Sequence, residues 1–187
     1  MPPEPWLVKN PAVERPFSAD DVPLIANNAR NSIAQRYVPG PTHKVLALAP
    51  TGQIGYYISQ DSISEAVRRV LEFCGLSAGV PCAVIATDNV FAVAVPTSMK
   101  AVGFFRPAAE RAIAPAERED VARRLADNSS GWNAVAVGIR GLAGLSLKAA
   151  GEGESVTQAL TECGRRDQEC RVIAIGMFSV EAKVAVR

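Results

Sequence analysis

An internal repeat with paired cysteines is the feature of this sequence that most restricts its fold. Shifted by 89 positions, residues 44–75 align with 133–164 without a gap, and eight of the 32 pairs are identical. Shifted by 88 positions, residues 82–86 align with 170–174, and four of these five pairs are identical. Because cysteines and glycines recur in the same order, we expect two tandem copies of one unit. The predicted parts are an extended lead-in (1–16), unit one (17–96), a connector (97–104) and unit two (105–187).

Each unit shows the same predicted order of elements. Residues 45–49 and 54–58 are apolar runs on either side of a glycine-containing turn, which is typical of a β-hairpin. The apolar residues that follow fall on one helical stripe, namely Ile63, Val67, Val70, Leu71 and Cys74. With a helix before the hairpin and a strand after Cys82, the unit is α-β-β-α-β. This order predicts an α+β fold whose antiparallel or mixed sheet carries its helices on one face, with the two units related by a pseudo-two-fold axis.

Glycines recur at three places in the two units. Gly52 and Gly141 suit the positive φ that such turns require. Gly55 and Gly144 lie within the second strand of each hairpin, which predicts a bulge or a close approach by another segment. Helix ends are expected just before Gly75 and Gly164, after a start capped by Ser62 or Ser64, and residues 90–95 are expected to add a strand.

The four cysteines occupy matched positions in the two units. The repeat favours the local pairs Cys74–Cys82 and Cys163–Cys170, because both bridges would then be identical. Two alternatives stay open, namely buried thiols and a metal site, although neither pair has the usual metal-knuckle spacing. Disulfides would place the protein in the periplasm or outside the cell, whereas reduced thiols would fit the cytoplasm.

The composition excludes several classes of function. The net charge is +1, with 20 basic and 19 acidic side chains, which does not favour nucleic-acid binding. No apolar run is long enough to span a membrane, and residues 1–16 lack the features of a signal peptide, so we expect any export signal to have been removed. A single histidine excludes a metal centre that needs two, and no cofactor motif occurs.

Few residues are candidates for a functional site. Tyr56 and Tyr57 are consecutive in a predicted strand, so their rings should lie on opposite faces of the sheet, and one could line a cleft. His43 precedes the first strand of unit one and has no counterpart in unit two. Arg140, in the hairpin turn of unit two, is the fourth candidate for ligand or partner contact. We assign no catalytic residue.

Residues 134–175, above all Ala159–Cys163 and Cys170–Ala174, resemble a widespread bacterial domain of unknown function, and residues 45–87 do so more loosely. In that family the strand–turn–strand–helix–Cys–loop–Cys–strand pattern occurs in exported proteins and in tails of signalling or caspase-like proteins. This chain differs in lacking an aromatic residue in the hairpin of unit two. The resemblance implies an accessory module and assigns no chemistry.

These observations favour a non-catalytic binding or interaction module, exported or part of a larger envelope or signalling protein, with an unidentified protein or small ligand as partner. The alternative is a small hydrolase or transferase with its site between the two repeats. A pocket that gathers His43 with an acid and a Ser or Tyr would support that alternative, and its absence would count against it.

Overall fold

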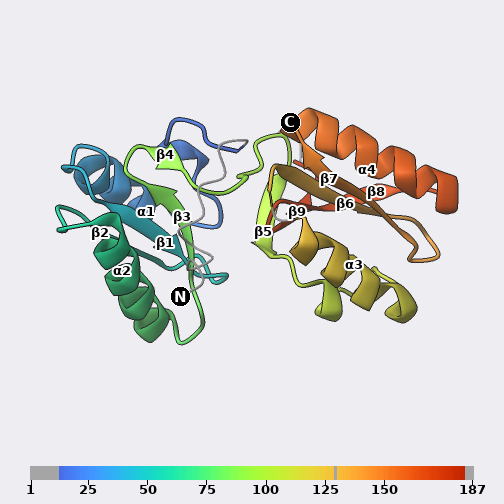
Figure 1. Ribbon diagram of the computed structural model, residues 1–187, viewed down its shortest axis with the longest axis horizontal. Coiled ribbons are helices and arrows are strands. Elements are labelled where there is room, and N and C mark those ends of the chain that lie inside the picture. The colour runs from blue at the N-terminus through green and yellow to red at the C-terminus, as the bar shows by residue number, and fades with distance from the viewer. Residues whose placement is uncertain (1–12, 129, 184–187) are drawn as a thin grey trace. The chain divides into compact units, whose positions relative to one another are not determined.

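The computed structural model describes residues 13–128 and 130–183, and it divides into two units between Val93 and Ala94 (Figure 1). Each unit combines helices with an antiparallel sheet, so the predicted α+β class is confirmed. The predicted end of unit one, at residue 96, lies three residues from this division. Within the described residues no helix is both long enough and apolar enough to cross a membrane.

Unit one has a four-stranded sheet in the order β2-β1-β3-β4, with every neighbouring pair antiparallel. Its elements are η2 (Ala19–Asp21), α1 (Asn27–Ser32), the π-helical η3 (Ile33–Tyr37), β1 (Val45–Leu48), β2 (Ile54–Tyr57), α2 (Ile63–Ala78), β3 (Ala83–Thr87) and β4 (Val90–Phe91).

Unit two has a five-stranded antiparallel sheet in the order β5-β9-β8-β6-β7. Its elements are β5 (Lys100–Phe104), η4 (Pro107–Ala109), α3 (Pro115–Asp127), β6 (Trp132–Val137), β7 (Ala143–Ala149), α4 (Glu152–Arg166), β8 (Arg171–Ile175) and β9 (Phe178–Glu181). The strand β5 falls within the predicted connector (97–104), so that prediction is wrong: residues 100–104 are an edge strand of unit two.

The two sheets share strand register. In the hairpins, Ala47 pairs with Gly55 and Ala136 pairs with Gly144, and these are the residues that the 89-position shift aligns. The pairing of β1 with β3 shifts register after Leu46, and the pairing of β6 with β8 shifts after the aligned Val135. The aligned residues therefore occupy equivalent places in the two sheets, while the origin of the units by duplication stays a prediction.

The helices cover both faces of each sheet, which corrects the expectation of helices on one face (Figure 1). In unit one, Tyr57 contacts Phe73 of α2, whereas its neighbour Tyr56 contacts Tyr37 of η3. In unit two, the backbone of α4 lies against Gly144, whereas the next residue, Leu145, packs in a cluster with α3. Because consecutive strand residues point to opposite faces, each sheet lies between two helical layers.

Helix α2 begins where the sequence predicted and ends later. The Ser62 side chain accepts a hydrogen bond from the Glu65 amide at 3.1 Å, which satisfies a free amide of the first turn. The helix ends at Gly79, whose φ of +67° suits a glycine. Gly75 and Gly164 lie inside α2 and α4, so their predicted role as helix ends is wrong.

Two other predictions at the borders of unit one need correction. The strand expected over residues 90–95 is limited to Val90–Phe91. Most of the predicted lead-in (1–16) lies outside the described residues, but its described part belongs to unit one. Val13 is buried, and Pro16 forms an isolated antiparallel bridge with Val90.

Candidate functional site

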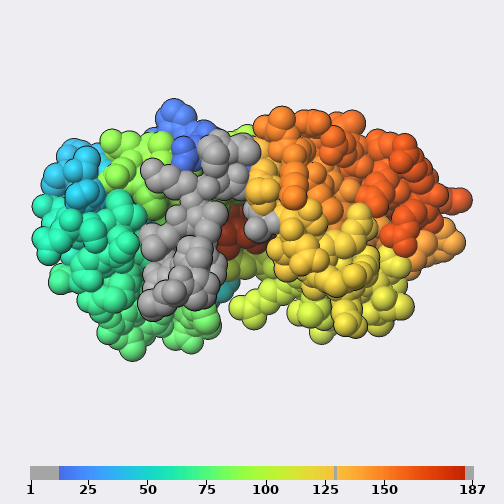
Figure 2. All heavy atoms as spheres, in the orientation of Figure 1, coloured from blue at the N-terminus to red at the C-terminus, as the bar shows by residue number. Residues whose placement is uncertain are grey.

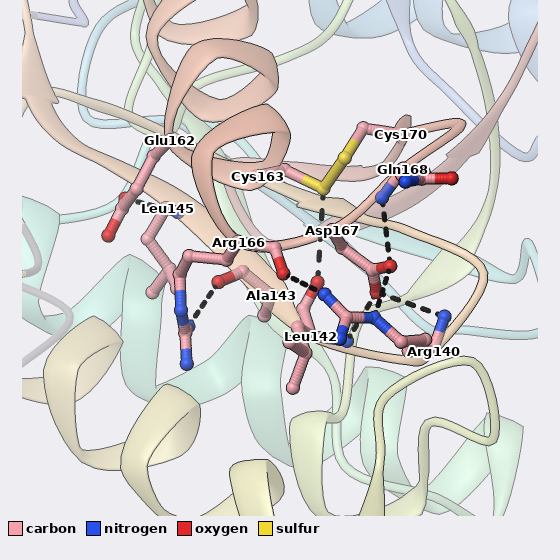
Figure 3. The surroundings of a disulfide bond; sticks show 10 residues. All are labelled: Arg140, Leu142, Ala143, Leu145, Glu162, Cys163, Arg166, Asp167, Gln168 and Cys170. Carbon is pink, nitrogen blue, oxygen red and sulfur yellow. Dashed lines mark hydrogen bonds and ion pairs between the residues drawn. A yellow bond between two sulfur atoms is a disulfide. The ribbon is translucent and has the colours of Figure 1, made fainter.

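Both predicted disulfides are present. Cys74 is bonded to Cys82 and Cys163 to Cys170, with Cα atoms 6.1 Å apart in each pair. Figure 3 shows the second of these bonds. Each bond joins a helix to the strand that follows it and thereby fixes the helix against its sheet. No cysteine among the described residues is left as a free thiol.

Arg140 is held by Asp167, beside the disulfide of unit two (Figure 3). The Asp167 carboxylate accepts hydrogen bonds from the Arg140 amide and side chain and from the amides of Leu142 and Gln168. Burial raises the pKa of Asp167, but these hydrogen bonds outweigh burial, so the pKa lies below its usual value. Arg140 also donates to the Arg166 carbonyl. The predicted contact residue therefore fixes the β6–β7 turn against the loop after α4.

His43 lies in an exposed loop before β1, with a φ of +57°. Its Nδ1 lies 3.1 Å from the Gln60 carbonyl oxygen, and its own carbonyl accepts from the Gln60 amide. Among residues 13–128 and 130–183, the hydrogen bonds and ion pairs of His43 include no carboxylate. The geometry that the hydrolase alternative requires is thus not assembled around His43 in the described part of the chain.

Lys44, next to His43, is buried, and its Nζ donates to the carbonyls of Val38 and Gly40 at 2.8 and 2.7 Å. Burial lowers the pKa of this amine, while Asp88 acts in the opposite direction. The amine is buried, and its hydrogen bonds hold the chain that follows η3. We therefore interpret Lys44 as a structural residue rather than a nucleophile.

The outer edge of the unit-two sheet is capped by a carboxylate. In an antiparallel pair, hydrogen-bonded and non-hydrogen-bonded positions alternate. Gly138 donates to the Leu142 carbonyl, so the Val135–Leu145 position is non-hydrogen-bonded and the Leu145 amide points away from β6. The Oε2 atom of Glu162, in α4, accepts a hydrogen bond from the Leu145 amide, with a nitrogen–oxygen distance of 2.6 Å. The edge strand β7 is therefore closed at its middle.

At the equivalent edge in unit one, the described residues provide no such cap. Ala49 donates to the Gln53 carbonyl at 2.8 Å, so the amide and carbonyl of Tyr56 point away from β1 by the same alternation. The residue aligned with Glu162 is Phe73, which offers no acceptor atom. Within the described part of the chain, no side chain takes the Tyr56 amide hydrogen.

Exposed apolar side chains flank this open edge. Phe73 is 49% exposed and Leu76 is 80% exposed, one helical turn apart on α2. Tyr57 of β2 meets Phe73 edge to face, with ring centroids 6.2 Å apart. We call Tyr57, Phe73 and Leu76 the α2–β2 patch; α2 lies at the surface in Figure 2, in teal and green at the lower left. Such a grouping of large apolar side chains beside an unpaired edge is typical of a contact surface.

Of the predicted contact residues, Tyr57 belongs to the α2–β2 patch, and the backbone amide and carbonyl of Tyr56 lie on the open edge of β2. The Tyr56 ring lies on the other face of the sheet, where its hydroxyl is 3.3 Å from that of Ser32. Sequence reasoning missed Phe73, Leu76 and Glu162. Their signal was available, because Phe73 and Leu76 are apolar residues off the buried stripe of α2, and the repeat aligns Phe73 with a glutamate.

No protein-family model, no curated protein and no solved structure matches this chain. Within the described residues, no group of three or more histidine, cysteine or acidic side chains is arranged to hold a metal ion.

Proposed function

We propose that this protein is a non-catalytic interaction module that binds a segment of a partner protein at the α2–β2 patch. The observation that carries the proposal is the difference between the two sheet edges. Glu162 closes the edge of unit two, whereas Phe73 and Leu76 leave an apolar surface beside the open edge of unit one. Solvent exposure of large apolar side chains at such a place is unfavourable, and a partner would remove it from water.

The proposal includes an oxidising compartment, the periplasm or the exterior of the cell. Two disulfides support it, since such bonds persist where thiols are not kept reduced. Membership of the bacterial domain family of unknown function is part of the same proposal. Intact mass after alkylation without reductant tests the compartment: protein isolated from its native cells should take up no alkyl groups, and four would contradict the assignment.

A library of linear seven-residue peptides displayed on phage provides a probe for the unidentified partner. We expect peptides selected on the whole protein to bind in solution, and F73S/L76S to weaken their binding by at least about tenfold. I139S is the matched control, because Ile139 is an exposed apolar residue of unit two, and it should leave binding unchanged. Circular dichroism would confirm that both variants fold.

Two results would contradict the proposed function. The first is a library that yields no binding peptide. The second is a set of peptides that bind F73S/L76S as tightly as the unmodified protein, which would place their site elsewhere.

A further inference from the structure

We infer that the partner segment is an extended strand that adds to β2 through its backbone, and that Phe73 in the place of a glutamate keeps this edge available. The inference rests on the proposed function, since it specifies how the α2–β2 patch would hold its partner. Strand addition to an exposed sheet edge is a common mode of peptide recognition, in which backbone hydrogen bonds hold the peptide and alternate side chains give specificity.

The backbone geometry of the two units supports strand addition. In unit two, the Leu145 amide, which points away from β6, donates a hydrogen bond to Glu162 Oε2 at 2.6 Å. This oxygen lies where a carbonyl oxygen of an added strand would otherwise accept that hydrogen bond. The other carboxylate oxygen of Glu162 lies 3.4 Å from the Arg124 guanidinium, so the cap is held by α3 as well. An added strand would have to displace this charged group. At β2, no side chain of residues 13–128 or 130–183 occupies the corresponding place beside the outward amide of Tyr56.

Side chains on the two faces of β2 indicate what the segment should contain. The Phe73 ring lies against β2, because its Cδ1 is 3.2 Å from where a Cβ on Gly55 would stand. On that face an added strand would meet the Phe73 ring, with Leu76 one turn further along α2, so an apolar residue is expected opposite Phe73. On the other face it would pass the hydroxyls of Tyr56 and Ser32, which suit polar residues.

The size of the surface favours a short segment over a second copy of this chain. Strand β2 has four residues, which at about 3.3 Å each is the length of a short peptide strand. A stable dimer usually buries about 800 Å² on each partner. Four edge residues and two exposed apolar side chains are a smaller surface than that, whereas an added strand of about four to six residues spans the length of β2.

The test uses the peptides selected from the seven-residue library, with the full-length protein. F73E restores the residue type of unit two and should weaken binding by at least about tenfold, whereas F73L keeps the edge free and should stay within about threefold. Hydrogen exchange followed by NMR should show the Tyr56 amide at least about tenfold slower when the peptide is bound. N-methylation of the peptide should abolish binding at alternate positions only, since only alternate amides face β2.

The possible failures are distinguishable. Peptides that require Phe73 but leave Tyr56 exchange unchanged and tolerate N-methylation everywhere would overturn strand addition while the proposed function stands. The absence of any selected peptide would overturn both. A dimer detected by light scattering and lost in F73E would show that a second copy, not a partner peptide, occupies the edge.

Discussion

Replacement of Gly144 by alanine should disrupt unit two more than any other glycine-to-alanine change considered for this chain. Gly144 is in β7, directly beneath α4. A Cβ added there would stand 2.1 Å from the Cys163 nitrogen and 2.4 Å from the Ala159 carbonyl oxygen. Both are backbone atoms of α4, so no rotation of a side chain can relieve the clash.

The size of the effect follows from the displacement that the methyl group requires. Carbon and its neighbours pack at about 3.5 Å, so α4 would have to move by more than about 1 Å from the sheet. Overpacking of a core costs about 1–3 kcal/mol. Because the Cys163–Cys170 bond also resists this movement, we expect a loss of about 3 kcal/mol or more. In a unit of this size, that loss lowers the midpoint of thermal unfolding by about 12–24 °C.

Two other alanine variants provide matched controls. Gly55 is the counterpart of Gly144, but the nearest atoms to its added Cβ are side-chain atoms of Cys74 and Phe73 at 3.1 and 3.2 Å. The Phe73 ring can turn aside, and the Cys74 Cβ, which moves only with α2, would be a few tenths of an ångström too close, so G55A should cost less than G144A, about 1 kcal/mol. Gly164 lies inside α4 with nothing within 4 Å of the added Cβ, so G164A should stabilise by about 0.5–1 kcal/mol.

Urea unfolding of the full chain, followed by tryptophan fluorescence, measures these differences. In a W6F background the remaining tryptophan is Trp132, the first residue of β6 in unit two. A G144A variant whose free energy of unfolding lies within about 1 kcal/mol of its parent would refute the reasoning, since it would show that α4 can leave the sheet at little cost.

Two further predictions concern the disulfide of unit one and the acid stability of unit two. C74A/C82A should lose about 2.5 kcal/mol in urea unfolding, the chain-entropy estimate for a loop of this length; unmodified protein without reductant is the reference, and equal stability of the two would contradict the estimate. Burial raises the pKa of Glu152, but hydrogen bonds from Ser98 and Thr97 outweigh burial and hold that pKa below its ordinary 4.5. A carboxyl with a lowered pKa in the fold stabilises it above the unfolded value, so unit two should weaken as the pH falls below about 4.5. E152Q should flatten this acid dependence in unfolding titrations, and an unchanged slope would exclude the carboxylate as its source.

The close approach within each hairpin and the cysteine pairing could be predicted because the repeat compares each unit with the other. Aligned cysteines indicated identical local bridges, and aligned Gly55 and Gly144 indicated a close approach in the second strand of each hairpin. A close approach is present at both, although the neighbour of Gly144 is helix backbone and that of Gly55 is a pair of side chains. Comparison of the two units thus separates the positions that both copies of the fold require from the positions at which the copies differ.

The layering of the helices could not be predicted in the same way. The apolar stripe of α2 shows that one side of the helix is buried, but it does not show which face of the sheet receives it. That choice depends on the direction in which the chain leaves β2. Strand β5 was missed for another reason: its counterpart in unit one is reduced to the bridge between Pro16 and Val90, which an 88-position shift aligns with Phe104 and Phe178 of unit two. Residues 13–16 share no identity with residues 101–104, so the repeat did not reveal this strand.

The contrast between Phe73 and Glu162 bears on the function more than any residue that the two units share. Unpaired sheet edges promote association, and proteins commonly protect them with charged side chains. Glu162 provides this protection in unit two. At the aligned place in unit one, a half-exposed phenylalanine stands beside an amide that no side chain of the described residues accepts. Under the proposed function, the partner segment would cover this ring and pair with the amide beside it.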